Sequence, residues 1–172
     1  MSSRAQAEQH IEVHKFYGGA TVVVAFLALV VQAFLNKYGS WAGLLELPLL
    51  VTIYFSLSRR NASTGLLLGA SIGILQDAVS HMPIGYYGIA KTLIGYFASS
   101  LGARVDTENP ISRFIIVVIF YHFHGAALTL LDRLLLARPA PYFSWKILVA
   151  SAVNAGIGVL LFAALDHLRK PS

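Results

Sequence analysis

Residues 74–96, with the sequence ILQDAVSHMPIGYYGIAKTLIGY, place Asp77 and Lys91 on either side of a proline and two glycines in an otherwise apolar stretch. A carboxylate and an ammonium group in this arrangement could form a structural ion pair, a polar binding site or an acid–base pair. A charge at the centre of a membrane helix costs about 2.5–3.5 kcal/mol, so each needs a partner or water. The plainer alternative is that Asp77 caps a helix end, while the aliphatic stem of Lys91 lets its ammonium group reach the membrane surface.

The other residues that could do chemistry give weaker signals. Ser71 lies in GASIG, which matches the G-x-S-x-G motif, but that motif needs a strand before the serine and this one lies within an apolar helical run. His122 and His124 are two positions apart, whereas ligands on one helical face are three or four apart, so we predict packed histidines and no metal site. With no cysteine in the chain, thiolate chemistry is excluded, and we predict neither enzymatic activity nor a cofactor.

The composition indicates a membrane protein. The chain has 172 residues, of which 56% are hydrophobic and 12% charged, and its mean hydropathy is +0.66. A soluble domain would carry about 25% charged residues. The net charge of +5 is typical of basic loops that face anionic lipid, and we do not read it as a sign of nucleic-acid binding.

Six apolar segments are separated by short polar turns, which predicts an all-α integral membrane protein with a single transmembrane domain over residues 1–172. The predicted helices are 18–35, 43–57, 65–79, 86–103, 111–131 and 145–168.

Lysine and arginine in the loops favour an orientation with both termini in the cytoplasm. This orientation places eight basic residues inside and four outside. The inside residues are Arg4, Lys15, Arg59, Arg60, Arg104, Arg113, Arg169 and Lys170, and the outside ones are Lys37, Arg133, Arg138 and Lys146.

In this orientation the polar residues of the spans share the outer half of the membrane. They form either an outward-facing pocket, which could also dock a partner, or a buried network. The residues predicted for this site are Glu46, Pro48, Gln76, Asp77, Pro83, Gly85, Lys91 and Asn154.

Glycines recur every four residues in the third segment, at Gly65, Gly69 and Gly73. Small residues at this spacing let a second helix approach closely. We predict packing within the bundle, with Gly95 of the next segment also at a helix contact, and favour this over a homodimer.

The stretch ELPLLVTIYFSLSRR, followed by GLLLGASIGILQDAVSHMPIGYYGIAKTLIGYFAS, resembles the rod shape-determining protein MreD family. Asp77 and Gly85 match the family's aspartate and loop glycine, and SWKILVASAVNAGIG resembles its last helix, with Asn154 at the asparagine. In the family a proline usually precedes the acidic residue, whereas here Glu46 precedes Pro48.

The resemblance implies a six-helix fold similar to the substrate-binding (S) subunits of energy-coupling-factor transporters. It also implies a non-enzymatic scaffold of the rod (elongation) complex in the bacterial inner membrane, which helps regulate peptidoglycan synthesis and cell shape. The implied partners are membrane lipid and an MreC-type single-span protein, and through it a RodA-type polymerase, a class B penicillin-binding transpeptidase and MreB. The alternative is a vitamin-binding S-subunit, although Ala20 and Ala25 of the first segment do not form the small-residue repeat typical of those subunits.

Overall fold

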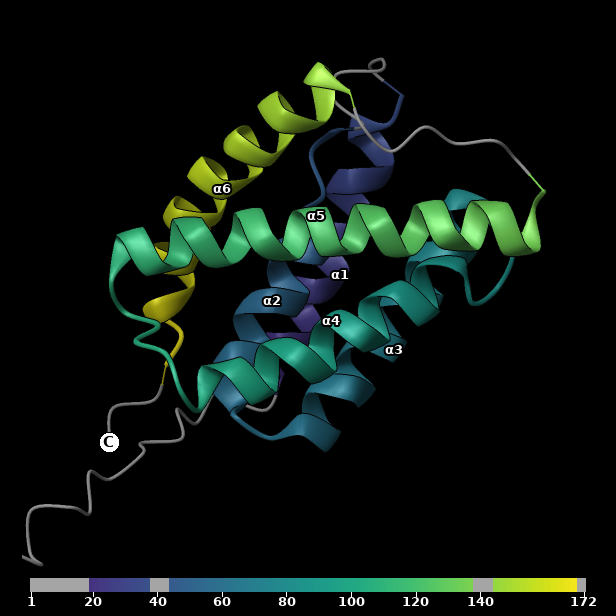
Figure 1. Ribbon diagram of the computed structural model, residues 1–172. Coiled ribbons are helices and arrows are strands. Elements are labelled where there is room, and N and C mark those ends of the chain that lie inside the picture. The colour runs from purple at the N-terminus through teal and green to yellow at the C-terminus, as the bar shows by residue number, and fades with distance from the viewer. Residues whose placement is uncertain (1–18, 38–43, 138–143, 170–172) are drawn as a thin grey trace, which may run out of the picture.

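The computed structural model describes residues 19–37, 44–137 and 144–169, and over these residues the chain is all-helical (Figure 1). Four of the basic residues counted above, Arg4, Lys15, Arg138 and Lys170, lie outside this range. Six helices occupy the described residues: α1 (Ala20–Leu35), α2 (Leu47–Arg59), α3 (Ala62–Ser80), α4 (Tyr86–Gly102), α5 (Pro110–Leu135) and α6 (Trp145–Asp166).

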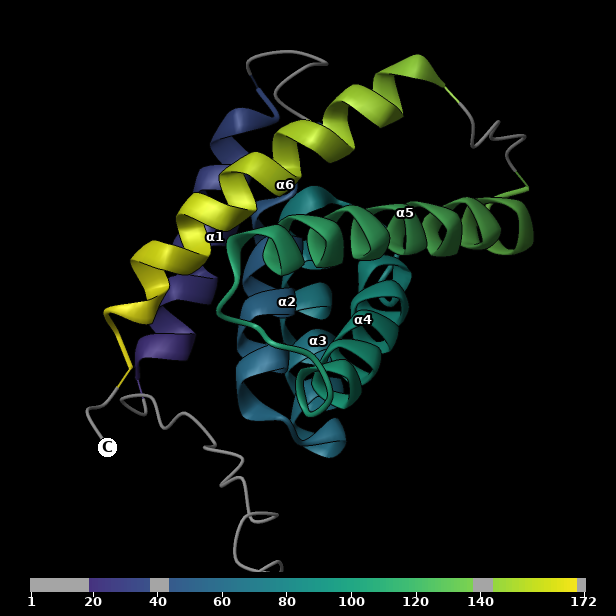
Figure 2. The ribbon, with the colours of Figure 1, turned by 60° about the vertical axis from the view of Figure 1, so that its left-hand side comes forward.

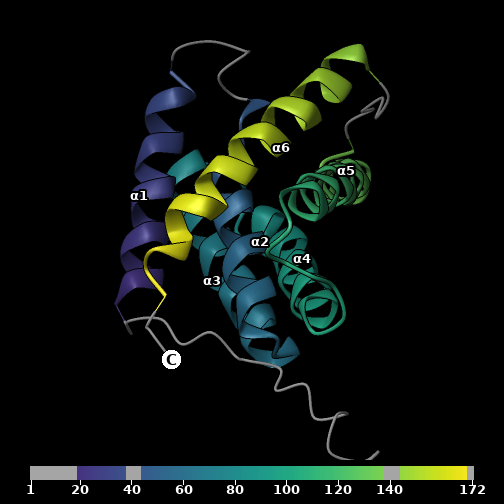
Figure 3. The ribbon, with the colours of Figure 1, turned by 90° about the vertical axis from the view of Figure 1, so that its left-hand side faces the viewer.

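Helix α2 is the core of the bundle. Every residue from 48 to 58 is buried, and α2 contacts each of the other five helices. In Figures 2 and 3, α1 and α4 lie on opposite sides of α2. The surrounding helices bury one face only, as in α1, where Thr21, Ala25, Ala28, Leu29 and Gln32 point inward while Val22 and Phe26 are exposed. Exposed apolar faces around a buried centre are the pattern expected of a bundle in lipid.

Local sequence signals explain several helix ends. Asn61, Asn109 and Ser144 precede α3, α5 and α6, and each side chain accepts a hydrogen bond from a backbone N–H of the first turn. Helix α2 begins at Leu47, later than the predicted residue 43, with Pro48 in its first turn, where a proline needs no N–H donor. Helix α5 continues to Leu135, four residues beyond the predicted end.

Helices α3 and α4 form a tightly packed hairpin. A Cβ atom on Gly69 would lie 1.9 Å from the carbonyl oxygen of Lys91, and one on Gly73 would lie 2.5 Å from that of Tyr87. Gly65 and Gly95 meet at the other end of the same contact. The structure therefore places all four glycines at the α3–α4 interface, where any side chain would separate the two backbones.

Helix α5 crosses α2 at a steep angle in Figure 1 and is seen almost end-on in Figure 3. Three of the described helices, α3, α5 and α6, are long and apolar enough to cross a membrane, and α1 and α2 are apolar but shorter. The chain is therefore a helical membrane protein.

One end of the bundle gathers the arginines, and we call it the basic end. There Arg59, at the end of α2, donates to Thr21 at the start of α1, with 3.4 Å between Nη2 and Oγ1. Arg169, after α6, pairs with Glu108, which precedes α5. The described residues that define the basic end are Arg59, Arg60, Arg104, Arg113 and Arg169.

Candidate functional site

The short segment that leads into α2 is held by polar side chains from three other helices. The Asn154 side chain of α6 accepts from the N–H of Glu46 at 2.9 Å and donates to the carbonyl of Leu44 at 2.8 Å. Gln32 of α1 accepts from the N–H of Leu47 at 3.0 Å, and the Tyr121 hydroxyl of α5 donates to Leu44 at 3.1 Å. These bonds satisfy irregular backbone that could not otherwise lie within a membrane.

The Glu46 carboxylate meets Lys91 of α4 across this segment. Lys91 Nζ lies 3.5 Å from Glu46 Oε2, and the same oxygen accepts from Gln76 Nε2 of α3 at 3.4 Å. Lys91 is completely buried and the Glu46 side chain is 14% exposed. The pair therefore neutralises two charges within the bundle.

Lys91 has two further neighbours. Its Nζ lies 3.3 Å from His124 Nε2 of α5 and 4.8 Å from the centre of the Tyr87 ring. An ammonium group only donates, so the contact requires an unprotonated Nε2 on His124. The ring face adds a cation–π attraction at a buried site. We call Gln32, Glu46, Gln76, Lys91, His124 and Asn154 the polar centre, and all six helices reach it either through these side chains or through the backbone of Leu47.

Asp77 has a different role, because it caps the helix that follows its own. Its carboxylate accepts from three backbone N–H groups at the start of α4, those of Gly85 at 2.8 Å, Tyr87 at 2.7 Å and Gly88 at 3.2 Å. Gly85 is the N-cap residue with φ of +101°, a conformation that favours glycine. A carboxylate at a helix N-terminus is stabilised by both the free N–H groups and the helix dipole.

The two charges on either side of the turn thus have separate partners. Asp77 and Lys91 are fully buried, as are Pro48, Gln76 and Asn154. Of the two arrangements that the sequence left open, an outward pocket and a buried network, the contacts of these residues fit the network, which is held by its own hydrogen bonds and ion pair. Only Pro83 of the predicted residues is exposed, while Gly85 borders a hollow of about 260 Å³ beside Ile89, and Asn154 one of about 120 Å³ beside Val149.

Sequence reasoning missed Gln32, Tyr121 and the role of His124. Gln32 carried a usable signal, because it is the most polar residue of an apolar span. The hydroxyl of Tyr121 and the pairing of His124 with Lys91 depend on how α5 crosses the bundle, which no local pattern reports.

A second ionic cluster at the basic end was also missed. Asp166 of α6 accepts from Arg113 at 2.7 Å and from the Tyr54 hydroxyl at 2.9 Å, and it pairs with Arg169 at 2.7 Å. The cluster joins α2, α5 and α6 at the basic end. The sequence places Arg113 and Asp166 on the same side of the membrane but gives no reason to pair them.

The contacts at these sites are structural in kind. The Lys91 and Glu46 groups pair with each other, and the Ser71 hydroxyl is exposed and donates to the carbonyl of Leu67 in its own helix at 2.8 Å. In the part of the chain that the structure describes, no group of three or more histidine, aspartate or glutamate side chains could hold a metal ion.

The fold and the polar centre define a helical membrane protein whose interior charges join helices. Residues 14–136 match the family model described as rod shape-determining protein MreD. The chain belongs to this family and thus to the rod shape-determining system. The family is not known for enzymatic activity. No curated protein and no solved structure matches the chain.

Proposed function

We propose that the chain is a non-enzymatic scaffold of the rod complex in the bacterial inner membrane, which binds an MreC-type single-span protein. Through this partner it would act on a RodA-type polymerase, a class B penicillin-binding transpeptidase and MreB, and so help regulate peptidoglycan synthesis. The observation that carries the proposal is that the interior charges are paired within the bundle. Lys91 and Asp77 are fully buried and satisfied by the bundle's own groups, which suits a rigid support.

The proposal includes an orientation and a fold relationship. Both termini would lie in the cytoplasm, because the basic end then faces the side where arginine and lysine are enriched. The six helices would be arranged as in the S-subunits of energy-coupling-factor transporters. A vitamin-binding function would require an open polar pocket, whereas Gln76, Asp77 and Lys91 are buried, so we make no second proposal.

Co-purification tests the partner. The full chain would be co-expressed with a tagged MreC-type protein from the same genome and purified in mild detergent, with an unrelated single-span protein carrying the same tag as the control. We expect the chain to be retained by the MreC-type protein and not by the control. Equal retention by both, or by neither, would contradict the proposal.

A further inference from the structure

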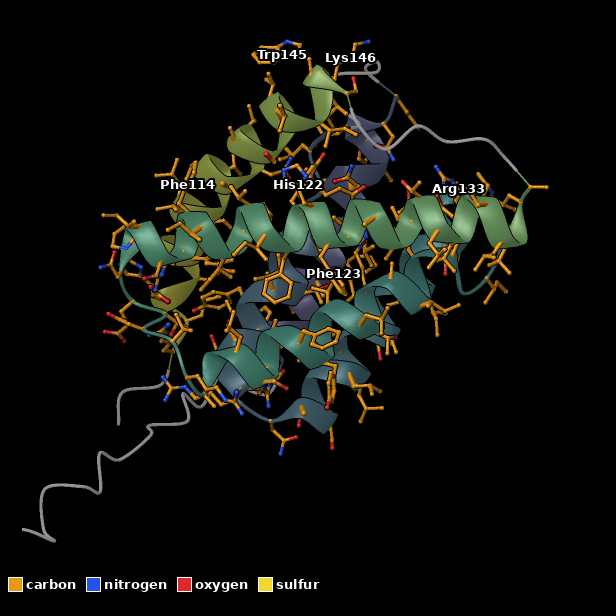
Figure 4. The ribbon with its side chains drawn as sticks, viewed as in Figure 1. Phe114, His122, Phe123, Arg133, Trp145 and Lys146 are labelled. Atoms are coloured by element: carbon orange, nitrogen blue, oxygen red, sulfur yellow. The ribbon has the colours of Figure 1, made fainter. Side chains whose placement is uncertain are left out.

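A groove of about 400 Å³ lies between α4 and α5, and none of the polar-centre residues lines it. Its walls are apolar and aromatic. In Figure 4, Phe123 lies on the side of α5 that faces α4, while His122 lies on the opposite side. The Phe97 and Phe123 rings meet edge to face at 5.5 Å. The lining residues are Phe97, Ser100, Leu101 and Arg104 of α4 and the segment after it, and Ile119, Phe120 and Phe123 of α5.

One end of the groove carries an arginine that forms no ion pair with any residue in the described ranges. Arg104 follows the last turn of α4 at the basic end and is exposed. Two other arginines of the basic end, Arg113 and Arg169, are paired with Asp166. Among the described residues, Arg104 forms no ion pair, so its guanidinium group is available to an anion at the membrane surface.

The dimensions of the groove favour a narrow occupant. Phe97 and Arg104 are seven residues apart, which is about 10 Å along a helix. The Phe97 and Phe123 ring centres are only 5.5 Å apart, which leaves no room at that point for a helix about 10 Å across to lie between α4 and α5. An extended hydrocarbon chain is thinner, and 10 Å covers about two thirds of one leaflet of a bilayer with a core of roughly 30 Å.

We propose that this groove binds an anionic glycerophospholipid, with an acyl chain between α4 and α5 and its phosphate on Arg104. Apolar walls bury the chain, and the arginine fork fits two phosphate oxygens. Basic pockets between membrane helices on the cytoplasmic side bind anionic head groups in the same way. The proposal does not depend on the MreC-type partner, because no residue of that partner takes part in the site.

Native mass spectrometry of the purified full chain tests the site. Phosphatidylglycerol and phosphatidylcholine with identical acyl chains would be added in turn. We expect the wild type to retain phosphatidylglycerol about fivefold better, which corresponds to about 1 kcal/mol for one arginine near the surface. Arg104→Gln should lower phosphatidylglycerol retention to the phosphatidylcholine level, while Arg60→Gln, at the same end but outside the groove, should leave the preference unchanged.

A second pair of variants tests the apolar walls. Ser100→Trp fills the groove, and it removes only a bond within α4, from the Ser100 hydroxyl to the carbonyl of Tyr96. It should abolish retention of both lipids. Ile115→Trp, on an exposed part of α5 outside the groove, should retain them.

Three outcomes would overturn the proposal. The first is equal retention of the two lipids by the wild type, and the second is an unchanged preference in Arg104→Gln. The third is a dimer or partner complex that Ser100→Trp dissociates while lipid retention stays the same, because the groove would then be a protein interface.

Discussion

At the scale of single residues, the interior charges are divided between two tasks. Lys91 joins helices that are distant in sequence through Glu46 and His124, whereas Asp77 closes the turn between α3 and α4. Removing one member of a buried ion pair leaves an uncompensated charge, which costs about 3–5 kcal/mol in proteins. Replacing both members costs less than the sum of the single changes.

Double-mutant cycles distinguish these tasks. Glu46→Gln and Lys91→Met, singly and together, should show a coupling of at least about 1 kcal/mol in the free energy of unfolding, because the two atoms lie 3.5 Å apart. The cycle of Asp77→Asn with Lys91→Met serves as the control and should show a smaller coupling. Unfolding would be measured in mixed micelles. A larger coupling for Asp77 than for Glu46 would mean that Lys91 pairs across the turn instead.

The sequence identified the important polar residues, but it did not identify the groups that they contact. Intramembrane charges stand out against an apolar background, so Glu46, Asp77 and Lys91 were identifiable from their energetic cost alone. Their partners are backbone N–H groups and side chains brought together by helix crossings. Such contacts leave no local pattern, and the closed network was therefore indistinguishable from an open pocket.

At the scale of helices, the α3–α4 hairpin depends on the absence of side chains. Glycine spacing predicted a close contact, and the structure identifies α4 as the helix that makes it. Hydropathy alone could not predict that α2 is the central helix, because a helix facing protein and a helix facing lipid are equally apolar.

A pair of glycine substitutions tests the contact. Gly69→Ala places a Cβ atom 1.9 Å from the carbonyl oxygen of Lys91, and the rigid backbone there can yield only if the helices separate. We expect a loss of about 3 kcal/mol in the free energy of unfolding, at the upper end of overpacking costs. Gly156→Ala in α6 is the matched control, because nothing lies within 4 Å of its added Cβ. It should be neutral or stabilise the protein by about 0.5 kcal/mol, and equal effects at the two positions would argue against the close contact.

At the scale of the whole molecule, the positions of the arginines and the directions of the helices together predict the orientation in the membrane. The ends of α2, α4 and α6 and the starts of α1 and α5 meet at the basic end. The turn between α3 and α4 lies at the other end, since it follows α3. The two ends must therefore face opposite sides of the membrane if the helices cross it.

The chain contains no cysteine, so single cysteines report each end without background. His81→Cys marks the exposed α3–α4 turn, and Asp106→Cys marks the exposed loop between α4 and α5 at the basic end. With a membrane-impermeant maleimide on intact spheroplasts, we expect labelling at position 81 and protection at position 106, because loops rich in arginine stay in the cytoplasm. Both positions should label after permeabilisation, which controls for burial, and the unsubstituted chain should remain unlabelled. Labelling at 106 with protection at 81 would invert the orientation, and it would move the proposed lipid site to the outer leaflet, because Arg104 and residue 106 lie at the same end.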